Sequence, residues 1–124
     1  MLEQGKQVFL ADGEANPDQE LLADLYRQRI LDIHLTDIVG EGFSSWRQLM
    51  PSLIEMGISA SPHGSLFKTY YNAHLAGALG NMPTIEGVTC ESDEVDFGNY
   101  TLEEGKLTPS SAPGFGMKLL KDYS

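Results

Sequence analysis

The stretch Ile58-Ser59-Ala60-Ser61-Pro62-His63-Gly64-Ser65 decides how the rest of the chain is interpreted. It is a short apolar run that ends on a histidine, and a small residue and a serine then lead into an amphipathic segment. This order is typical of a strand, a chemically active side chain at its C-terminal tip and the N-cap of the next helix. A lone histidine is more often a surface or core residue, so the neighbouring segments decide what this one does.

Three other segments repeat the apolar run. The predicted strands are 8–11, 30–38, the segment from Ile58, and 84–88, and their starts are 22, 28 and 26 residues apart. Alternating strands and helices of this size predict an α/β fold with parallel strands joined by right-handed crossovers. A complete β/α barrel needs roughly 250 residues. The 124 residues therefore predict a partial, half TIM-type barrel of about four parallel strands alternating with helices.

Helical patterns fill the intervals between the predicted strands. Asn16-Pro17 is the predicted start of the first helix, since Asn can cap a helix and Pro suits its first position. The second helix is expected to be capped by Ser44 or Ser45 and to end at Gly57, with Pro51 producing a kink or a late start. Its apolar residues recur at helical spacing: Trp46, Leu49, Met50 and Leu53. A flexible loop is predicted at 40–42.

The third helix is predicted from Ser65 to the stop at Gly80-Asn81, with His74 as a packing residue on its apolar face. From Cys90 onward the strand–helix repeat ends. A short hairpin is expected around 103–105, and the remaining chain is rich in Pro, Gly and Ser. The sequence thus predicts a half-barrel over residues 1–90 and an extended segment over 91–124, which packs on the barrel or on a capping domain.

Composition excludes several kinds of partner. Aspartate and glutamate number 18 against 8 lysine and arginine, a formal net charge of −10. So acidic a chain is a poor candidate for binding nucleic acid or an anionic membrane surface. The single cysteine, Cys90, forms neither an intrachain disulfide nor a zinc motif. The cytoplasm is therefore the predicted location, and the sequence predicts neither a signal peptide nor a membrane span of about 20 apolar residues.

One ionisable side chain follows each predicted strand. These residues are Glu14, Asp37, His63 and Glu86, separated by 23, 26 and 23 residues. Parallel strands end at the same edge of a sheet, so the four side chains are expected to lie together there. A histidine beside an aspartate is a general acid/base pair, and a nearby carboxylate can ligate Mg²⁺. Glu91, Asp93 and Glu94 are interpreted as a solvated loop instead.

These motifs carry a resemblance to a known family. The chain from about Val8 to Leu119 resembles the C-terminal part of the enolase superfamily, in its mandelate racemase/muconate-lactonizing branch. The motifs that carry it are Ala11-Asp12-Gly13-Glu14, Thr36-Asp37-Ile38, Ser61-Pro62-His63-Gly64, Pro83-Thr84-Ile85-Glu86 and Pro113-Gly114-Phe115-Gly116. The resemblance implies that the four predicted strands are the fifth to eighth of a modified β/α barrel.

The resemblance also implies a role for each candidate residue. Glu14 matches the third carboxylate ligand of the family's Mg²⁺, and Asp37 and His63 match the Asp–His dyad that moves the proton alpha to a carboxylate. Glu86 matches the acid that hydrogen-bonds the substrate or its enediolate. The implied reaction is that of an acid-sugar dehydratase or a racemase/epimerase. The implied substrate is a small carboxylic acid or sugar acid.

The capping domain and the first four barrel strands, with their two metal carboxylates and lysine base, have no counterpart in this sequence. By itself the chain is therefore expected to lack a complete active site. Three hypotheses stay open. The chain is the C-terminal part of such an enzyme and works with an N-terminal half, it is a half-barrel that associates with another copy, or it is a non-enzymatic remnant.

Overall fold

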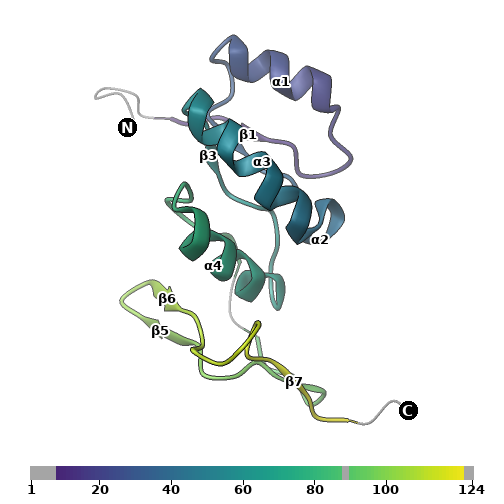
Figure 1. Cartoon of the computed structure of the whole chain (residues 1–124), viewed down its shortest axis with the longest axis vertical. Helices are drawn as coiled ribbons and strands as arrows, with labels where there is room; N and C mark the ends of the chain where they lie inside the picture. Colours follow the sequence, from purple (N-terminus) through teal and green to yellow (C-terminus); the bar gives the residue numbers. More distant parts are fainter. Residues whose placement is uncertain (1–7, 88–89, 122–124) are drawn as a thin grey trace.

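A computed structural model describes residues 8–87 and 90–121 of the chain. Its centre is a three-stranded parallel sheet in the order β1-β2-β3, formed by Ala11–Asp12, Ile33–His34 and Ser59–Ala60. Helix α1 (Gln19–Arg27) connects the first two strands, and α4 (Lys68–Leu79) follows the third. From α1 at one end of the molecule, the chain passes through the sheet to α4 and then to the C-terminal segment (Figure 1). The predicted α/β class with parallel strands is confirmed.

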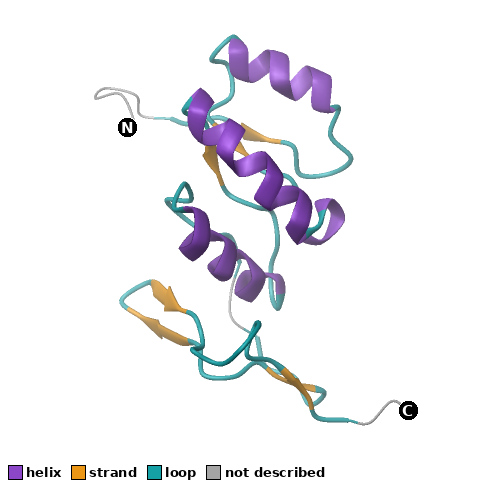
Figure 2. Cartoon of the chain, viewed as in Figure 1, coloured by secondary structure: helices purple, strands orange, loops and turns teal. Residues whose placement is uncertain are grey.

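The strands are much shorter than the helices (Figure 2), but their pairing continues beyond the named residues. The Leu35 N–H donates to the Asp12 carbonyl at 2.9 Å, and the Ser61 N–H donates to the His34 carbonyl at 2.9 Å. A further parallel bridge joins Asp37 to His63. The second and third strand segments therefore stay side by side up to the predicted site.

The predicted fourth strand, 84–88, is wrong for 84–87, and Val88 lies outside the described residues. The segment after α4 contacts the third strand through Asn81. The Ala60 N–H donates to the Asn81 carbonyl at 2.9 Å, and the Asn81 side-chain amide donates to the Ile58 carbonyl. Pro83 then follows, and proline has no N–H with which to continue a ladder. The described residues thus contain three parallel strands, where the sequence predicted about four.

Several predicted helix boundaries also differ. The N-cap of α1 is Asp18, whose Oδ1 accepts from the N–H groups of Glu20 and Leu21, while Asn16 adopts a left-handed φ of 44°. A short helix, α2 (Ile38–Glu41), forms where a loop was predicted at 40–42, because Asp37 caps it.

Helix α3 (Phe43–Met56) begins before the predicted caps Ser44 and Ser45, so the predicted late start is wrong, and it runs through Pro51 to Gly57. Helix α4 begins at Lys68 rather than Ser65, after a turn in which Leu66 and Phe67 remain exposed. Gly57 and Gly80 end their helices as predicted, both with φ of 73°.

The core lies between the helices and one face of the sheet. Its centre is the predicted apolar stripe of α3, whose residues Trp46, Met50 and Leu53 are fully buried. In the third strand segment Ile58, Ala60 and Pro62 are buried while Ser59, Ser61 and His63 are only partly so. Successive strand residues face opposite sides, so the second set, which includes His63, belongs to the face turned away from the core.

The C-terminal segment packs on α4 through aromatic rings. The predicted hairpin is confirmed by β5 (Thr101–Glu103) and β6 (Lys106–Thr108), and β4 (Val95–Asp96) pairs with β7 (Lys118–Leu119). The ring of Phe115 contacts Tyr71 at 4.7 Å and His74 at 5.1 Å between centroids. His74 is therefore a packing residue, as predicted. Among the described helices, none has the length and apolar character needed to cross a membrane.

One histidine is buried among polar partners in the core. The Nδ1 of His34 lies 2.5 Å from the Tyr26 hydroxyl, and its Nε2 lies 2.8 Å from the Thr36 hydroxyl. The imidazole also contacts the Trp46 ring edge-to-face, 5.0 Å between centroids. Burial lowers the pKa of His34 from 6.5 to about 4. Between about pH 4 and 6.5, therefore, the His34 side chain is mostly neutral in the folded chain and mostly protonated in the unfolded chain.

We expect His34 to make the fold acid-sensitive. Between pH 6.5 and about 4 only the unfolded state binds the proton, so stability is complete above pH 6.5 and falls as the pH drops. The full loss is about 3 kcal/mol. Urea unfolding at several pH values checks this, with His34→Gln removing about one proton from the slope of unfolding free energy against pH. Equal slopes for the two chains would contradict the assignment.

Candidate active site

Three of the four predicted site residues meet at the C-terminal edge of the sheet. The Nδ1 of His63 lies 2.7 Å from the Glu86 Oε2, and its Nε2 lies 3.2 Å from the Glu14 Oε1. Glu14 follows β1 and His63 follows β3, while Glu86 arrives from the segment after α4. The expectation that residues spaced along the sequence converge at one edge therefore holds for these three side chains.

The position of Glu86 is fixed by the backbone. Its Oε2 also accepts the Gly64 N–H at 3.1 Å. The next residue, Gly87, has φ of +109°, and a Cβ there would lie 2.2 Å from the Thr69 hydroxyl and 2.8 Å from the Gly64 carbonyl. Only glycine allows the chain to approach α4 this closely. The segment therefore delivers the Glu86 carboxylate to the imidazole although it is not a strand.

The histidine lies between two carboxylates and remains accessible. The side chain of His63 is 28% exposed, against 58% for Glu14 and 41% for Glu86. A neutral imidazole can donate from one nitrogen only, whereas an imidazolium donates from both. The shorter contact and the fixed position of Glu86 make Nδ1 the nitrogen that donates in the neutral form. Nε2, beside the more exposed Glu14, is then the nitrogen that can accept a proton from a substrate.

The Asp–His dyad would require Asp37 to pair with His63. In the structure Asp37 pairs with Lys68 instead. The Asp37 Oδ2 lies 2.5 Å from the Lys68 Nζ, and its Oδ1 accepts the N–H groups of Val39 and Gly40 at 2.7 and 2.8 Å. Burial raises the pKa of Asp37, but these hydrogen bonds and the Lys68 charge outweigh burial and hold the pKa below its ordinary value. Asp37 is thus a charged N-cap that is fully engaged on its own side of the edge.

Lys68 was not among the candidates from the sequence. It is the first residue of α4, five positions after His63, and no pattern in the sequence marks it. Its role becomes visible only when the start of α4 is known to be Lys68 rather than Ser65. A lysine in the middle of a predicted first turn would be expected to face solvent.

No family model matches the sequence, and no curated protein matches it significantly. The fold, however, is similar to solved structures. A galacturonate dehydratase from Geobacillus sp., complexed with D-galacturonate and 5-keto-4-deoxy-D-galacturonate, is 28% identical over 93% of this chain, with a TM-score of 0.71. A mandelate racemase/muconate lactonizing protein from Geobacillus sp. Y412MC10, complexed with magnesium and tartrate, is 28% identical over 93%, with a TM-score of 0.70. The resemblance to the enolase superfamily is confirmed.

The match covers only part of each enolase-superfamily protein. It spans 31% of the galacturonate dehydratase and 30% of the mandelate racemase/muconate lactonizing protein. A putative L-alanine-DL-glutamate epimerase from Burkholderia xenovorans LB400, bound to magnesium and fumarate, shares the fold at 18% identity, with a TM-score of 0.68. That match covers 90% of this chain and 27% of the epimerase. The chain therefore spans less than a third of the similar structures.

The donor set of this chain fits only part of a magnesium site. Glu14 offers an exposed carboxylate of the kind Mg²⁺ prefers. Although Glu14 and Glu86 both contact His63, no group of three His, Cys, Asp or Glu side chains within residues 8–87 and 90–121 is arranged to hold a metal ion. Glu91, Asp93 and Glu94 are exposed and form no such cluster. A complete magnesium site would require carboxylates from outside the described residues.

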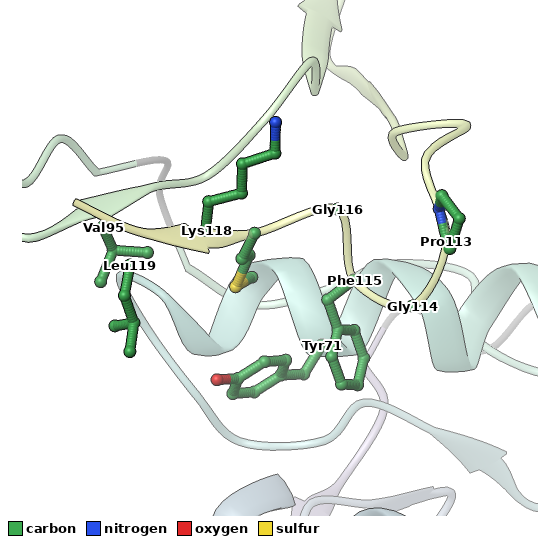
Figure 3. A pocket seen from close by; sticks show the side chains of 9 residues that line it. Tyr71, Val95, Pro113, Gly114, Phe115, Gly116, Lys118 and Leu119 are labelled. Carbon is green, nitrogen blue, oxygen red and sulfur yellow. The ribbon is translucent and has the colours of Figure 1, made fainter. Parts of the chain in front are cut away.

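A cavity of about 460 Å³ lies elsewhere, between α4 and the C-terminal segment. It is lined by Tyr71, Val95 and the run 113–119, and Figure 3 shows the rings of Tyr71 and Phe115 close together beneath that run. None of the four predicted site residues lines it. The cavity therefore reflects how the C-terminal segment packs and does not belong to the His63 site.

Asp37 should be more important to stability than an ordinary helix cap. Asp37→Ala removes both the cap and the Lys68 partner, whereas Asp37→Asn keeps a cap acceptor. We expect alanine to cost about 1 kcal/mol more than asparagine from the cap alone, with a further loss in both variants from the unpaired Lys68 charge.

Urea unfolding of both variants measures these losses. The matched control is Asp18, the N-cap of α1, which accepts two N–H groups and forms no ion pair within residues 8–87 and 90–121. Asp18→Asn should then be nearly neutral. An Asp37→Asn variant as stable as Asp18→Asn would show that the Lys68 pair contributes nothing.

Proposed function

We propose that this chain supplies the proton-transfer part of an active site that removes the proton alpha to a carboxylate. The enzyme would be a Mg²⁺-dependent acid-sugar dehydratase, racemase or epimerase. The observation that carries the proposal is His63 held at the C-terminal sheet edge, with Glu86 on Nδ1 and Glu14 beside Nε2. Similarity to enolase-superfamily structures that contain carboxylic acids supports the same reaction class.

The ligands of the similar dehydratase indicate which reaction would be balanced. D-galacturonate and 5-keto-4-deoxy-D-galacturonate differ by one water. Removing the proton alpha to the carboxylate, expelling the hydroxide from the neighbouring carbon and tautomerising the product accounts for every atom. A histidine suits both transfers, because it can accept the alpha proton and return a proton to the departing hydroxide.

The residues of this chain divide that work. His63 would take the proton through Nε2, while Glu86 holds the ring through Nδ1 and stabilises the imidazolium that forms. Glu14 would hold a magnesium ion, which when bound would neutralise the charge developing on the substrate carboxylate. Asp37 is the third predicted catalytic residue. Its role would be to fix the structure of this edge, because it caps α2 and pairs with Lys68.

The remaining ligands would come from an N-terminal half of the barrel or from another copy of the chain. In support, β1 pairs only with β2 within the described residues, and the adjoining Val8 and Leu10 side chains are 67% and 49% exposed. An unpaired parallel edge with apolar side chains favours association. The second candidate is a half-barrel that associates with another copy of the chain. If the chain associates with nothing, it would be a non-enzymatic remnant.

The mass of the particle in solution tests how the barrel is completed. Light scattering on a sizing column gives the mass, and mass spectrometry of the same peak identifies its chains. We expect either a second polypeptide in the peak or a mass that is at least twice the 13.6 kDa of one chain. A peak at 13.6 kDa alone would remove both ways of completing the site.

His63→Asn should abolish exchange of the alpha proton. The assay mixes the chain with a galacturonate dehydratase that lacks the corresponding segment, adds Mg²⁺, and follows deuterium uptake from D₂O into D-galacturonate. The variant should lose at least about 10³-fold in rate while its stability changes by about 0.5 kcal/mol or less. His74→Asn, altered outside the site, should keep the exchange. Undiminished exchange in the His63 variant would remove this residue from the base role.

Glu14→Gln should weaken magnesium binding in the same assembly. An amide is a poorer ligand for a hard cation than a carboxylate, so the dissociation constant should rise about tenfold or more. Calorimetric titration with Mg²⁺ measures the change. Glu91→Gln, in the exposed acidic loop, serves as the matched control. An equal affinity in both variants would mean that Glu14 is not a ligand.

A further inference from the structure

Asn72 is a polar side chain that lies fully buried on α4. Its Nδ2 donates to the Pro62 carbonyl at 2.9 Å, while its Oδ1 accepts no hydrogen bond within residues 8–87 and 90–121. The reverse orientation of the amide would bring two acceptors together at Pro62, so this contact settles which atom is which. A buried amide that is only half satisfied costs stability. Its contact with Pro62 therefore needs an explanation other than stability.

The contact with Pro62 holds the peptide group that leads into His63. The Pro62 carbonyl and the His63 N–H belong to one planar unit. Asn72 holds the carbonyl end of this unit, and the N–H end donates to the Thr36 carbonyl at 3.1 Å. The His63 carbonyl in turn accepts the Ile38 N–H at 3.1 Å. Strand pairing thus fixes the main chain of His63 from one side, and Asn72 fixes it from the side of α4.

Thr69 makes a similar contact with the other arm of the site. It lies three residues before Asn72 on α4 and therefore on the same face of the helix, and it is also buried. Its hydroxyl donates to the Glu86 carbonyl at 3.4 Å, and Gly87 packs closely against it. One face of α4 thus contacts the main chain of both segments that bring His63 and Glu86 together.

We propose that Asn72 is a positioning residue, which holds the Pro62–His63 peptide group against α4 and thereby sets the direction in which the His63 side chain leaves the sheet edge. It acts through the main chain of His63 and not through a contact with a substrate. Its significance for proton transfer rests on the proposed function, because a base displaced by about 1 Å can lose about 10²-fold in rate. The position of the peptide group does not depend on that function.

Amide hydrogen exchange in the full chain tests this position without substrate or metal. Asn72→Leu keeps a similar volume but removes the donor to Pro62. The His63 amide should then exchange about tenfold or more faster, the effect of losing one buried hydrogen bond. The amides of Met50 and Leu53 in α3 should change by less than about threefold. A local loss of protection separates positioning from general stability, because global unfolding exposes all three amides together.

Tyr70→Phe is the matched control. Tyr70 is a buried neighbour on the same helix, and its hydroxyl contacts the N–H and the carbonyl of Cys90 at 3.3 and 3.2 Å. The variant therefore also loses a contact between an α4 side chain and the main chain, but not the one at Pro62. Its His63 amide should exchange within about threefold of the unmodified chain. If Asn72→Leu does not fold, Asn72→Ala, which also lacks the donor, takes its place.

The proposal is overturned if the His63 amide of the Asn72 variant exchanges at the rate of the unmodified chain. It is also overturned if the amides of Met50 and Leu53 accelerate by the same factor, since Asn72 would then contribute only to overall stability.

A second measurement uses the assembly with the shortened galacturonate dehydratase. Asn72→Leu should lower kcat for exchange of the alpha proton about tenfold or more and change KM by less than about twofold, because a misplaced base slows proton transfer without weakening substrate binding. Tyr70→Phe should keep both constants. An unchanged kcat would overturn the positioning role. Absence of exchange in the unmodified assembly would count against the proposed function instead, and the amide exchange would still decide what Asn72 does.

Discussion

The parallel pairing of the second and third strand segments is the constraint on which the site depends. Bonds from Ile38 to His63 and from His63 to Thr36 continue the ladder past the named strands. They set the level at which Asp37 and His63 leave the sheet. The buried residues of these segments, including His34 and Ile58, are fixed against α3. Because side chains alternate along a strand, burying one set necessarily presents the other set at the opposite face.

Electrostatics then decides which groups at that edge pair. Two carboxylates, an imidazole and an aspartate–lysine pair lie at the same edge of the sheet in a chain whose net charge is −10. Lys68 offsets the charge of one carboxylate there, that of Asp37. At this edge the charges thus form two separate sets of contacts, Glu86 and Glu14 with His63 and Asp37 with Lys68.

Much of this could be predicted from the sequence, because the signals are local. The spacing of apolar runs predicted the parallel α/β class, the stripe containing Trp46 predicted the core, and Gly57 and Gly80 marked helix ends. The convergence of Glu14, His63 and Glu86 followed from the repeat. What failed depended on single contacts between distant segments. The strand predicted at 84–87 did not form because Pro83 interrupts the ladder, and the partner of Asp37 changed because α4 starts three residues late.

The failed fourth strand shows that strand identity is not what the site requires. Glu86 reaches His63 from a segment with no ladder, because Gly87 packs against Thr69 and Gly64 and thereby fixes the carboxylate. A strand would fix the direction of Glu86 through repeated backbone bonds, whereas here one close approach and one N–H do so. Any polypeptide that completes the barrel beside this segment must therefore leave that contact undisturbed.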